Sequence, residues 1–258
     1  MKKILEENGY IVLESSFFKK LKKNLKDSIK FALNEILIRK RIKIVQNKNF
    51  DKFLEQVYKL EKRKKIEIFK SLYEVAPSLP NIFKLSSDYN FIKIAKKTGI
   101  KIPVIGTGCT LRIDRPKDYK RLTSIHQDQW YSFLSLNAIT IWFNLSSIKK
   151  KDGPLKVYGK SHKYGLLKFK DINMGTFKAS IKKTLKFNIK EIILKENQVL
   201  VFNQHLLHES GLNKSLNKPR ISLQIRFNDF KNISNLTSSF KFTSSNYVIK
   251  KQLQYKIQ

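Results

Sequence analysis

The chain has 258 residues, with 53 Lys and Arg against 20 Asp and Glu, and a formal charge of +33. Hydrophobic residues make up 41% and aromatic residues 12% of it, which argues against intrinsic disorder and predicts a substantial core. Its one cysteine, Cys109, excludes an internal disulfide and fits a reducing compartment. No apolar run reaches the roughly 18 residues of a membrane span, and acids follow the basic start at once, so we expect a cytoplasmic protein.

The positive charge raises the question of a nucleic-acid partner, because clustered Lys and Arg bind phosphate. Basic runs occur at 19–23, 62–65 and 149–151, but none is interleaved with aromatic residues as a base-stacking surface would be. We therefore expect solvated faces and consider nucleic acid an unlikely partner. The alternative is an anionic substrate, surface or polymer attracted by the field. The sequence sets no oligomeric state.

The first hundred residues have mainly helical patterns. Residues 8–14 predict a turn leading into a short strand. After Ser15, a candidate helix cap, apolar residues recur every three or four positions over 18–36 and predict an amphipathic helix. Two further helices are predicted over 50–75 and 81–99.

From residue 101 onward the apolar pattern shortens to period two, with Gly and Pro between the segments. Strands are predicted over 108–114, 138–145, 154–158, 198–202 and 220–227. Helices followed by a run of strands predict an α+β fold, with the helices packed on an all-β sandwich or barrel.

Two predicted strands alternate in polarity. Thr140, Trp142 and Asn144 share one face of the first, and polar side chains likewise share one face of 220–227. One interpretation is that the polar faces meet solvent and the apolar faces meet the core. The other is that helices cover the apolar faces while the polar faces line a functional cavity.

A candidate metal site begins at His126 and Asp128, which project to the same side of an extended backbone. With His208 downstream, two histidines and one carboxylate form the ligand set of non-heme Fe(II) oxygenases, which leaves coordination positions open. A chelating 2-oxo acid and O2 could fill them. Arg220 is a candidate fork for the far carboxylate of that acid, and Ser222 could add a hydroxyl donor on the same face.

Several motifs in order resemble those of the phytanoyl-CoA dioxygenase (PhyH) family of Fe(II)/2-oxoglutarate-dependent oxygenases. They are Asn8-Gly9-Tyr10-Ile11-Val12-Leu13, His126-Gln127-Asp128-Gln129-Trp130-Tyr131, Ile141-Trp142-Phe143-Asn144-Leu145, Asp152-Gly153-Pro154-Leu155, Ser161-His162-Lys163 and His208-Glu209-Ser210-Gly211. The resemblance spans nearly the whole chain.

This resemblance implies a double-stranded β-helix (jelly-roll, cupin-like) core with N-terminal helices packed on one face. We expect a single domain over 1–258, with helical support in 1–100, the catalytic core in 101–230 and a C-terminal extension in 231–258. The resemblance further implies that His126, Asp128 and His208 ligate Fe(II), with 2-oxoglutarate and O2 as cosubstrates. It also implies that Arg220 anchors 2-oxoglutarate.

Other residues receive more open assignments. By the same resemblance Trp142 lies close to the cosubstrate, and Arg112 assists there, with Arg115 as its alternative. Arg226 is the rival of Arg220 as anchor and otherwise a candidate substrate contact. Trp130 and Tyr131 are either wall packing or substrate contacts. His162, His205 and Cys109 are expected to be structural.

Two departures from the family pattern concern loops. His208 and Arg220 are twelve residues apart, one more than in many members, and Gly159-Lys160 replaces the usual Pro-Gly before Ser161. Since Asp128 is present, the halogenating variants that lack this carboxylate are disfavoured.

The preferred hypothesis is therefore an Fe(II)/2-oxoglutarate-dependent hydroxylase of a small, possibly anionic, metabolite. The alternative is a non-catalytic basic jelly-roll that binds an anionic ligand or nucleic acid. A third hypothesis combines the two, as an oxygenase that acts on nucleic acid or a nucleotide-linked substrate.

Overall fold

The computed structural model describes residues 1–44, 47–132, 135–173, 176–181 and 186–233. Its centre is a five-stranded antiparallel sheet with the strand order β1-β8-β3-β10-β2. The strands of this large sheet are β1 (Tyr10–Glu14), β2 (Pro103–Asp114), β3 (Ala138–Asn144), β8 (Gln198–Asn203) and β10 (Arg220–Asp229).

Two smaller antiparallel sheets complete the β-structure. The first has the order β7-β4-β9 and consists of β4 (Leu155–Gly159), β7 (Asn188–Ile192) and β9 (His208–Ser210). The second is the hairpin of β5 (Phe169–Asn173) and β6 (Thr176–Ala179). Strands β5, β6, β7 and β9 were not predicted, because they are short and carry no clear alternation of apolar residues. The large sheet and the β7-β4-β9 sheet together form the sandwich, which confirms the predicted α+β fold with a jelly-roll core.

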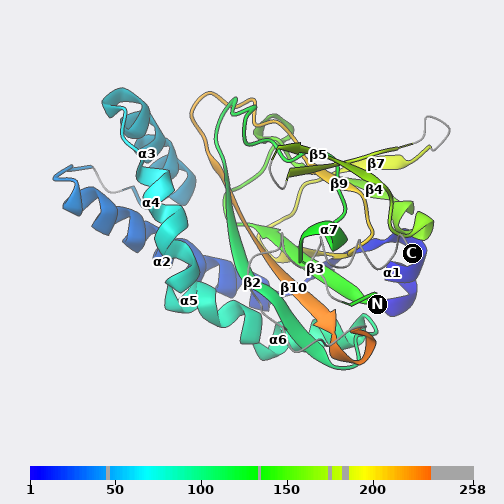
Figure 1. Cartoon of the computed structure of the whole chain (residues 1–258). Coiled ribbons are helices and arrows are strands. Elements are labelled where there is room, and N and C mark those ends of the chain that lie inside the picture. Colours follow the sequence, from blue (N-terminus) through cyan, green and yellow to red (C-terminus); the bar gives the residue numbers. More distant parts are fainter. Residues whose placement is uncertain (45–46, 133–134, 174–175, 182–185, 234–258) are drawn as a thin grey trace, which may run out of the picture.

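The helices precede this core in the chain, and most of them lie on one side of the large sheet (Figure 1). They are α1 (Lys2–Asn8), α2 (Ser16–Arg39), α3 (Phe50–Lys64), α4 (Ile68–Val75), α5 (Pro80–Phe83) and α6 (Tyr89–Lys97). A short α7 (Gln129–Ser132) lies within the core. The Ser15 hydroxyl caps α2 as predicted, by accepting the Phe17 N–H at 3.2 Å.

The prediction of one continuous helix over 50–75 is wrong, because the segment forms two helices, α3 and α4. The segment breaks at Lys65, which adopts a left-handed backbone with φ +52°. The Glu61 carboxylate accepts the Phe69 N–H at 2.7 Å at the start of α4, and Arg115 binds the same carboxylate at 3.0 Å. The carboxylate at the break is thus held by Arg115, the residue after β2, a contact that the local periodicity does not reveal. The third predicted helix likewise divides into α5 and α6, because the Asp88 side chain caps α6.

The helical layer covers the apolar face of the large sheet. Phe91 of α6 is fully buried and stacks on Phe143 of β3, with ring centroids 6.1 Å apart. Ile139 and Ile141 share that face and belong to the same core cluster. The opposite face of β3, which carries Trp142, turns toward the smaller sheet. The structure thus supports the second interpretation of the alternating strands, in which the polar face lines a cavity.

Candidate metal and cosubstrate site

The two histidines are brought together by the backbone. His126 and His208 form an isolated antiparallel bridge, in which each N–H donates to the carbonyl of the other at 3.0 Å. Their rings lie 4.1 Å apart, and Asp128 follows two residues after His126, just before α7. All three side chains are buried, and one ligand atom from each lies within 4.8 Å of the others.

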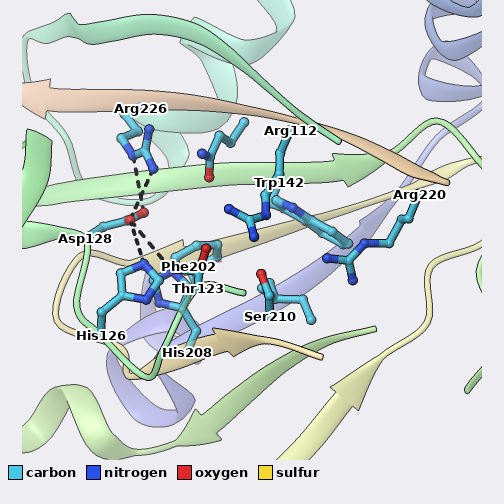
Figure 2. Close-up of a pocket in the computed structure, with 12 residues that line it drawn as sticks. Arg112, Thr123, His126, Asp128, Trp142, Phe202, His208, Ser210, Arg220 and Arg226 are labelled. Atoms are coloured by element: carbon cyan, nitrogen blue, oxygen red, sulfur yellow. Dashed lines mark hydrogen bonds and ion pairs between the residues drawn. The ribbon is translucent and has the colours of Figure 1, made fainter. Parts of the chain in front are cut away.

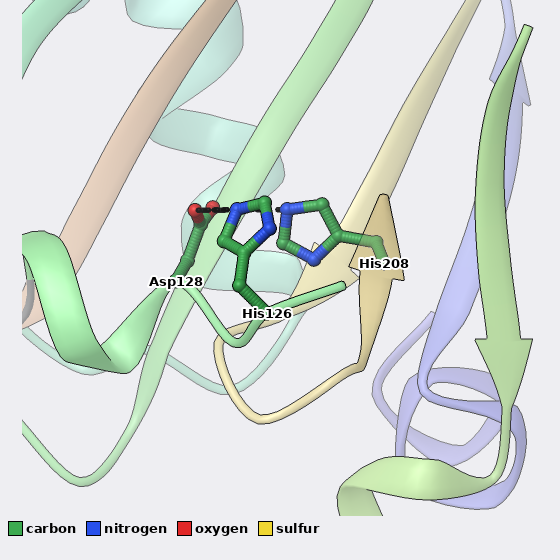
Figure 3. Close-up of side chains that lie close together, drawn as sticks. All are labelled: His126, Asp128 and His208. Carbon is green, nitrogen blue, oxygen red and sulfur yellow. Dashed lines mark ion pairs between the residues drawn. The ribbon is translucent and has the colours of Figure 1, made fainter. Parts of the chain in front are cut away.

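The orientation of both imidazoles is set by backbone carbonyls. Nδ1 of His126 is 2.8 Å from the Ser124 carbonyl, and Nδ1 of His208 is 3.0 Å from that of Leu206. Both Nδ1 atoms therefore carry the proton, and each Nε2 lies 3.7 Å from Oδ1 of Asp128 (Figure 3). A carbonyl behind each histidine is the usual outer partner of a metal-ligating imidazole. The donor set therefore fits one divalent metal ion.

Burial and neighbouring charges hold His208 and Asp128 in the protonation states that a metal needs. Burial, and then the adjacent His126, lower the pKa of His208 to about 3, so its imidazole is neutral at physiological pH. Burial opposes ionisation of Asp128, but the Arg226 guanidinium and the two histidines outweigh it and hold the pKa of that carboxyl well below its usual range. Next to the Nε2 atom of His126, the site therefore presents a neutral His208 nitrogen and an ionised Asp128 carboxylate.

A cavity of about 250 Å³ extends from these three residues between the large sheet and the β7-β4-β9 sheet (Figure 2). It is lined by Arg112, Thr123, His126, Asp128, Trp142, Leu155, Phe202, His208, Ser210, Arg220, Gln224 and Arg226. The candidate metal ligands form one end, and Arg220 lies at the other with the Trp142 indole between them. Strands β2 and β10 supply the three arginines of the lining, and β3 supplies Trp142.

At the far end, Asp114 holds two arginines side by side. Its Oδ2 accepts hydrogen bonds from Nε and Nη2 of Arg220 at 3.0 and 2.5 Å, and its Oδ1 accepts one from Nε of Arg112 at 2.9 Å. Nη1 of Arg220 is buried and has no hydrogen-bond partner among the described residues. Since a buried donor without a partner is costly, this nitrogen fits an anionic oxygen of a ligand. Ser210 lines the cavity beside it.

The other predicted site residues fall into different places. Arg226 lies against Asp128, with Nη2 3.2 Å from Oδ1. Ser222 is buried but does not line the cavity, and its Oγ has no partner among the described residues. Trp130 is buried, and its ring centroid lies 4.9 Å from that of Phe169. The side chain of Tyr131 lies outside the described residues.

The remaining alternatives are also placed. Arg115 pairs with Glu61 rather than lining the cavity, whereas Arg112 lines it and shares Asp114 with Arg220. His162 binds the Glu6 carbonyl through Nε2 at 2.9 Å. Burial raises the pKa of the Cys109 thiol to about 12, which is typical of a structural cysteine.

Sequence reasoning missed Ser210 and Asp114. Ser210 lies two residues after His208 on β9 and so shares its face, a signal that the same alternation rule could have used. Asp114 lies two residues after Arg112 on β2 by the same rule. The contact of Thr140 with Asp128, at 2.5 Å, joins positions whose proximity only the fold creates.

The fold and the site together define the class, a non-heme iron oxygenase that depends on 2-oxoglutarate. Residues 108–222 match the family model described as Phytanoyl-CoA dioxygenase (PhyH). These residues make up most of the β-structured part of the chain, and their match agrees with the resemblance found in the sequence. No curated protein matches the sequence.

Solved structures show the same fold at low sequence identity. EctD from S. alaskensis, with 2-oxoglutarate and 5-hydroxyectoine, is 17% identical with a TM-score of 0.61, over 90% of this chain and 76% of that one. The apo form of the non-heme monooxygenase ThoJ is 12% identical with a TM-score of 0.57, over 98% and 99%. The epimerase SnoN, in complex with Fe3+, alpha ketoglutarate and nogalamycin RO, is 13% identical with a TM-score of 0.51, over 87% and 80%.

Proposed function

We propose that this chain binds Fe(II) through His126, Asp128 and His208, and that it hydroxylates a small anionic molecule in the cytoplasm. One observation carries the proposal: two imidazole Nε2 atoms lie 3.7 Å from one oxygen of a buried Asp, at the end of a cavity whose other end holds a partly unpaired guanidinium. We place the catalytic core within 101–230 of a single domain. In the part of the chain that the structure describes, no helix has the length and apolar character to span a membrane.

Separate residues of the chain orient the metal ligands and enclose the cavity. When bound, iron and 2-oxoglutarate supply the oxidant: O2 gives one oxygen atom to 2-oxoglutarate, which leaves as succinate and CO2, and the other to a substrate C–H bond, which becomes C–OH. The backbone carbonyls behind His126 and His208 keep both Nε2 atoms turned to the metal position. Trp142 and Phe202 wall the cavity and exclude water from it.

The far end of the cavity is suited to the distal carboxylate of 2-oxoglutarate. Arg220 is buried and fixed by Asp114, so its free Nη1 is oriented before the ligand arrives. The hydroxyl of Ser210 and the Arg112 guanidinium lie in the same lining. We assign these three side chains to the distal carboxylate. Trp142 then contacts the body of the cosubstrate.

The charge of the cavity favours an anionic substrate. Arg112, Arg220 and Arg226 face the two carboxylates that bind them, Asp114 and Asp128, which leaves one positive charge in excess. Fe(II) and doubly ionised 2-oxoglutarate cancel one another. A substrate with one negative charge neutralises the remainder, because an uncompensated charge in a cavity of low dielectric is costly.

The lysine-rich surface contributes little to this site. Lys19, Lys20 and Lys23 lie on the exposed face of α2, in the helical layer that covers the other side of the large sheet. A cavity of about 250 Å³ suits a small molecule. We therefore propose a small-molecule substrate rather than nucleic acid.

Release of succinate from 2-oxoglutarate tests the assignment. We expect the purified protein with Fe(II), ascorbate and 2-oxoglutarate to release succinate slowly without a substrate. His126→Ala and His208→Ala should each abolish this release, because each removes one of three metal donors. His162→Gln is the matched control, since Gln keeps a donor for the Glu6 carbonyl and lies outside the cavity. Release that survives in either alanine variant contradicts the proposal.

The charge of the substrate is tested with pairs of molecules. Carboxylic acids and their amides of the same shape should be compared for how strongly they stimulate succinate release. We expect the acids to stimulate more than the amides. Equal stimulation by both members of every pair that stimulates would contradict an anionic substrate.

A further inference from the structure

The two oxygens of Asp128 have different surroundings, although the side chain is fully buried. Oδ2 accepts hydrogen bonds from the Thr140 hydroxyl at 2.5 Å and from Nε of Arg226 at 3.3 Å. Oδ1 accepts one from Nη2 of Arg226 at 3.2 Å and lies 3.7 Å from both histidine Nε2 atoms. An ionised carboxylate offers about four lone-pair positions. Three are occupied here, and the remaining one, on Oδ1, faces the histidines.

The fold builds this arrangement from two neighbouring strands. Arg226 of β10 and Thr140 of β3 are direct cross-strand partners, so their side chains leave the sheet on the same face. On the other side of β10, the register with β2 shifts between Ile225 and Phe227, at Arg226 itself. Such irregularities are common next to active sites, where they change the direction in which a side chain leaves the strand. Both residues are buried, so neither contact is a loose surface pair.

The number of carboxylate oxygens that bind matters for the proposed reaction. An octahedral ion has six positions, and three protein donors leave three of them open. A chelating 2-oxo acid takes two and O2 needs the third. If both oxygens of Asp128 bound the ion, two positions would remain, and 2-oxoglutarate would fill both.

We propose that Thr140 and Arg226 are positioning residues that keep Asp128 a one-oxygen ligand and so preserve the position for O2. This inference rests on the proposed function. It assigns Arg226 to the metal ligand rather than to the substrate or to the 2-oxoglutarate carboxylate. The two residues act through Asp128.

Two variants release the second oxygen with little change of shape. Thr140→Val removes the hydroxyl and keeps the side-chain volume, while Thr140→Ser is the matched control that keeps the hydroxyl. Arg226→Lys keeps the positive charge beside Asp128 but removes the two-pronged contact. Each should be studied alone and in the double variant Thr140→Val/Arg226→Lys, so that one poorly folding protein does not decide the result.

The experiment uses nitric oxide as an unreactive substitute for O2, with Fe(II)-loaded protein under anaerobic conditions. The electron paramagnetic resonance signal of the iron–nitrosyl adduct is measured with and without 2-oxoglutarate. Without 2-oxoglutarate, we expect the wild type and all variants to bind nitric oxide alike. With saturating 2-oxoglutarate, we expect affinity for nitric oxide in Thr140→Val and in the double variant to fall at least about tenfold, a size typical of outer-shell substitutions. Thr140→Ser should match the wild type.

Other outcomes separate the two levels of the proposal. Equal nitric oxide affinity in all proteins with 2-oxoglutarate overturns the positioning role. A loss that is the same with and without 2-oxoglutarate also overturns it, since that indicates a damaged metal site. A wild type that binds neither Fe(II) nor 2-oxoglutarate overturns the proposed function, and this inference with it.

Discussion

Substitution of Arg220 by lysine isolates the contribution of the guanidinium fork to cosubstrate binding. Lysine keeps one positive charge against Asp114, so the buried carboxylate is not left without a partner. It does not reproduce the planar group, in which Nε and Nη2 hold Asp114 while Nη1 remains free for a ligand. The variant thus removes the free Nη1 donor for 2-oxoglutarate and keeps a positive charge beside Asp114.

The size of the effect follows from that single bond. A hydrogen bond to a charged group contributes about 1.5 to 3 kcal/mol, which corresponds to an increase of about 10- to 150-fold in the KM for 2-oxoglutarate. The bond is remote from the reacting atoms and is made equally before and during the reaction. We therefore expect kcat at saturating 2-oxoglutarate to change much less than KM.

Succinate release as a function of 2-oxoglutarate concentration measures both constants. The matched control is Arg115→Lys, because Arg115 pairs with Glu61 outside the cavity. Affinity for Fe(II), measured anaerobically, should be the same in all three proteins. The reasoning is refuted if Arg220→Lys leaves KM unchanged, or if Arg115→Lys raises it as much.

Two further predictions concern stability. Lys22 is buried, its ammonium donates to the carbonyls of Lys195 and Gln198, and burial lowers its pKa to about 7. Between about pH 7 and 10 the unfolded chain therefore binds one more proton than the folded protein, so the free energy of unfolding should rise with pH by up to about 1.4 kcal/mol per unit. Urea titrations at several pH values should show a smaller slope in Lys22→Met. An unchanged slope in that variant would contradict the prediction. Gly153 has φ +70°, and an added Cβ would lie 2.4 Å from the Gly211 carbonyl oxygen. Gly153→Ala should therefore lower the free energy of unfolding by more than about 1 kcal/mol. An unchanged free energy of unfolding in urea would contradict this prediction.

The sequence contained most of the site, because its chemistry depends on residue types at recognisable spacings. His126 and Asp128 share a face by simple alternation, and Arg220 follows His208 in the family pattern. The polarity of 220–227 was compatible with a cavity face and with a solvent-exposed face, and only the structure distinguishes the two. These signals are either local in the sequence or belong to short motifs that can be recognised without high overall sequence identity to the family.

What the sequence did not reveal depends on tertiary contacts. At the break after α3, Arg115 binds Glu61, which lies more than fifty positions earlier in the chain. The pairing of Thr140 with Arg226 requires β3 and β10 to be neighbours, although 86 residues separate them in the sequence. Strand β9 has only three residues and is defined by its partners rather than by its own pattern.

The most direct test of the central claim is the absorbance of the Fe(II)-loaded protein as 2-oxoglutarate is added without oxygen. A keto acid that chelates Fe(II) gives a visible charge-transfer band that neither component has alone. We expect the wild type to develop this band, and His208→Ala to lack it while keeping the circular dichroism of the wild type. A wild type without the band, or a His208→Ala variant that retains it, would contradict the site described above.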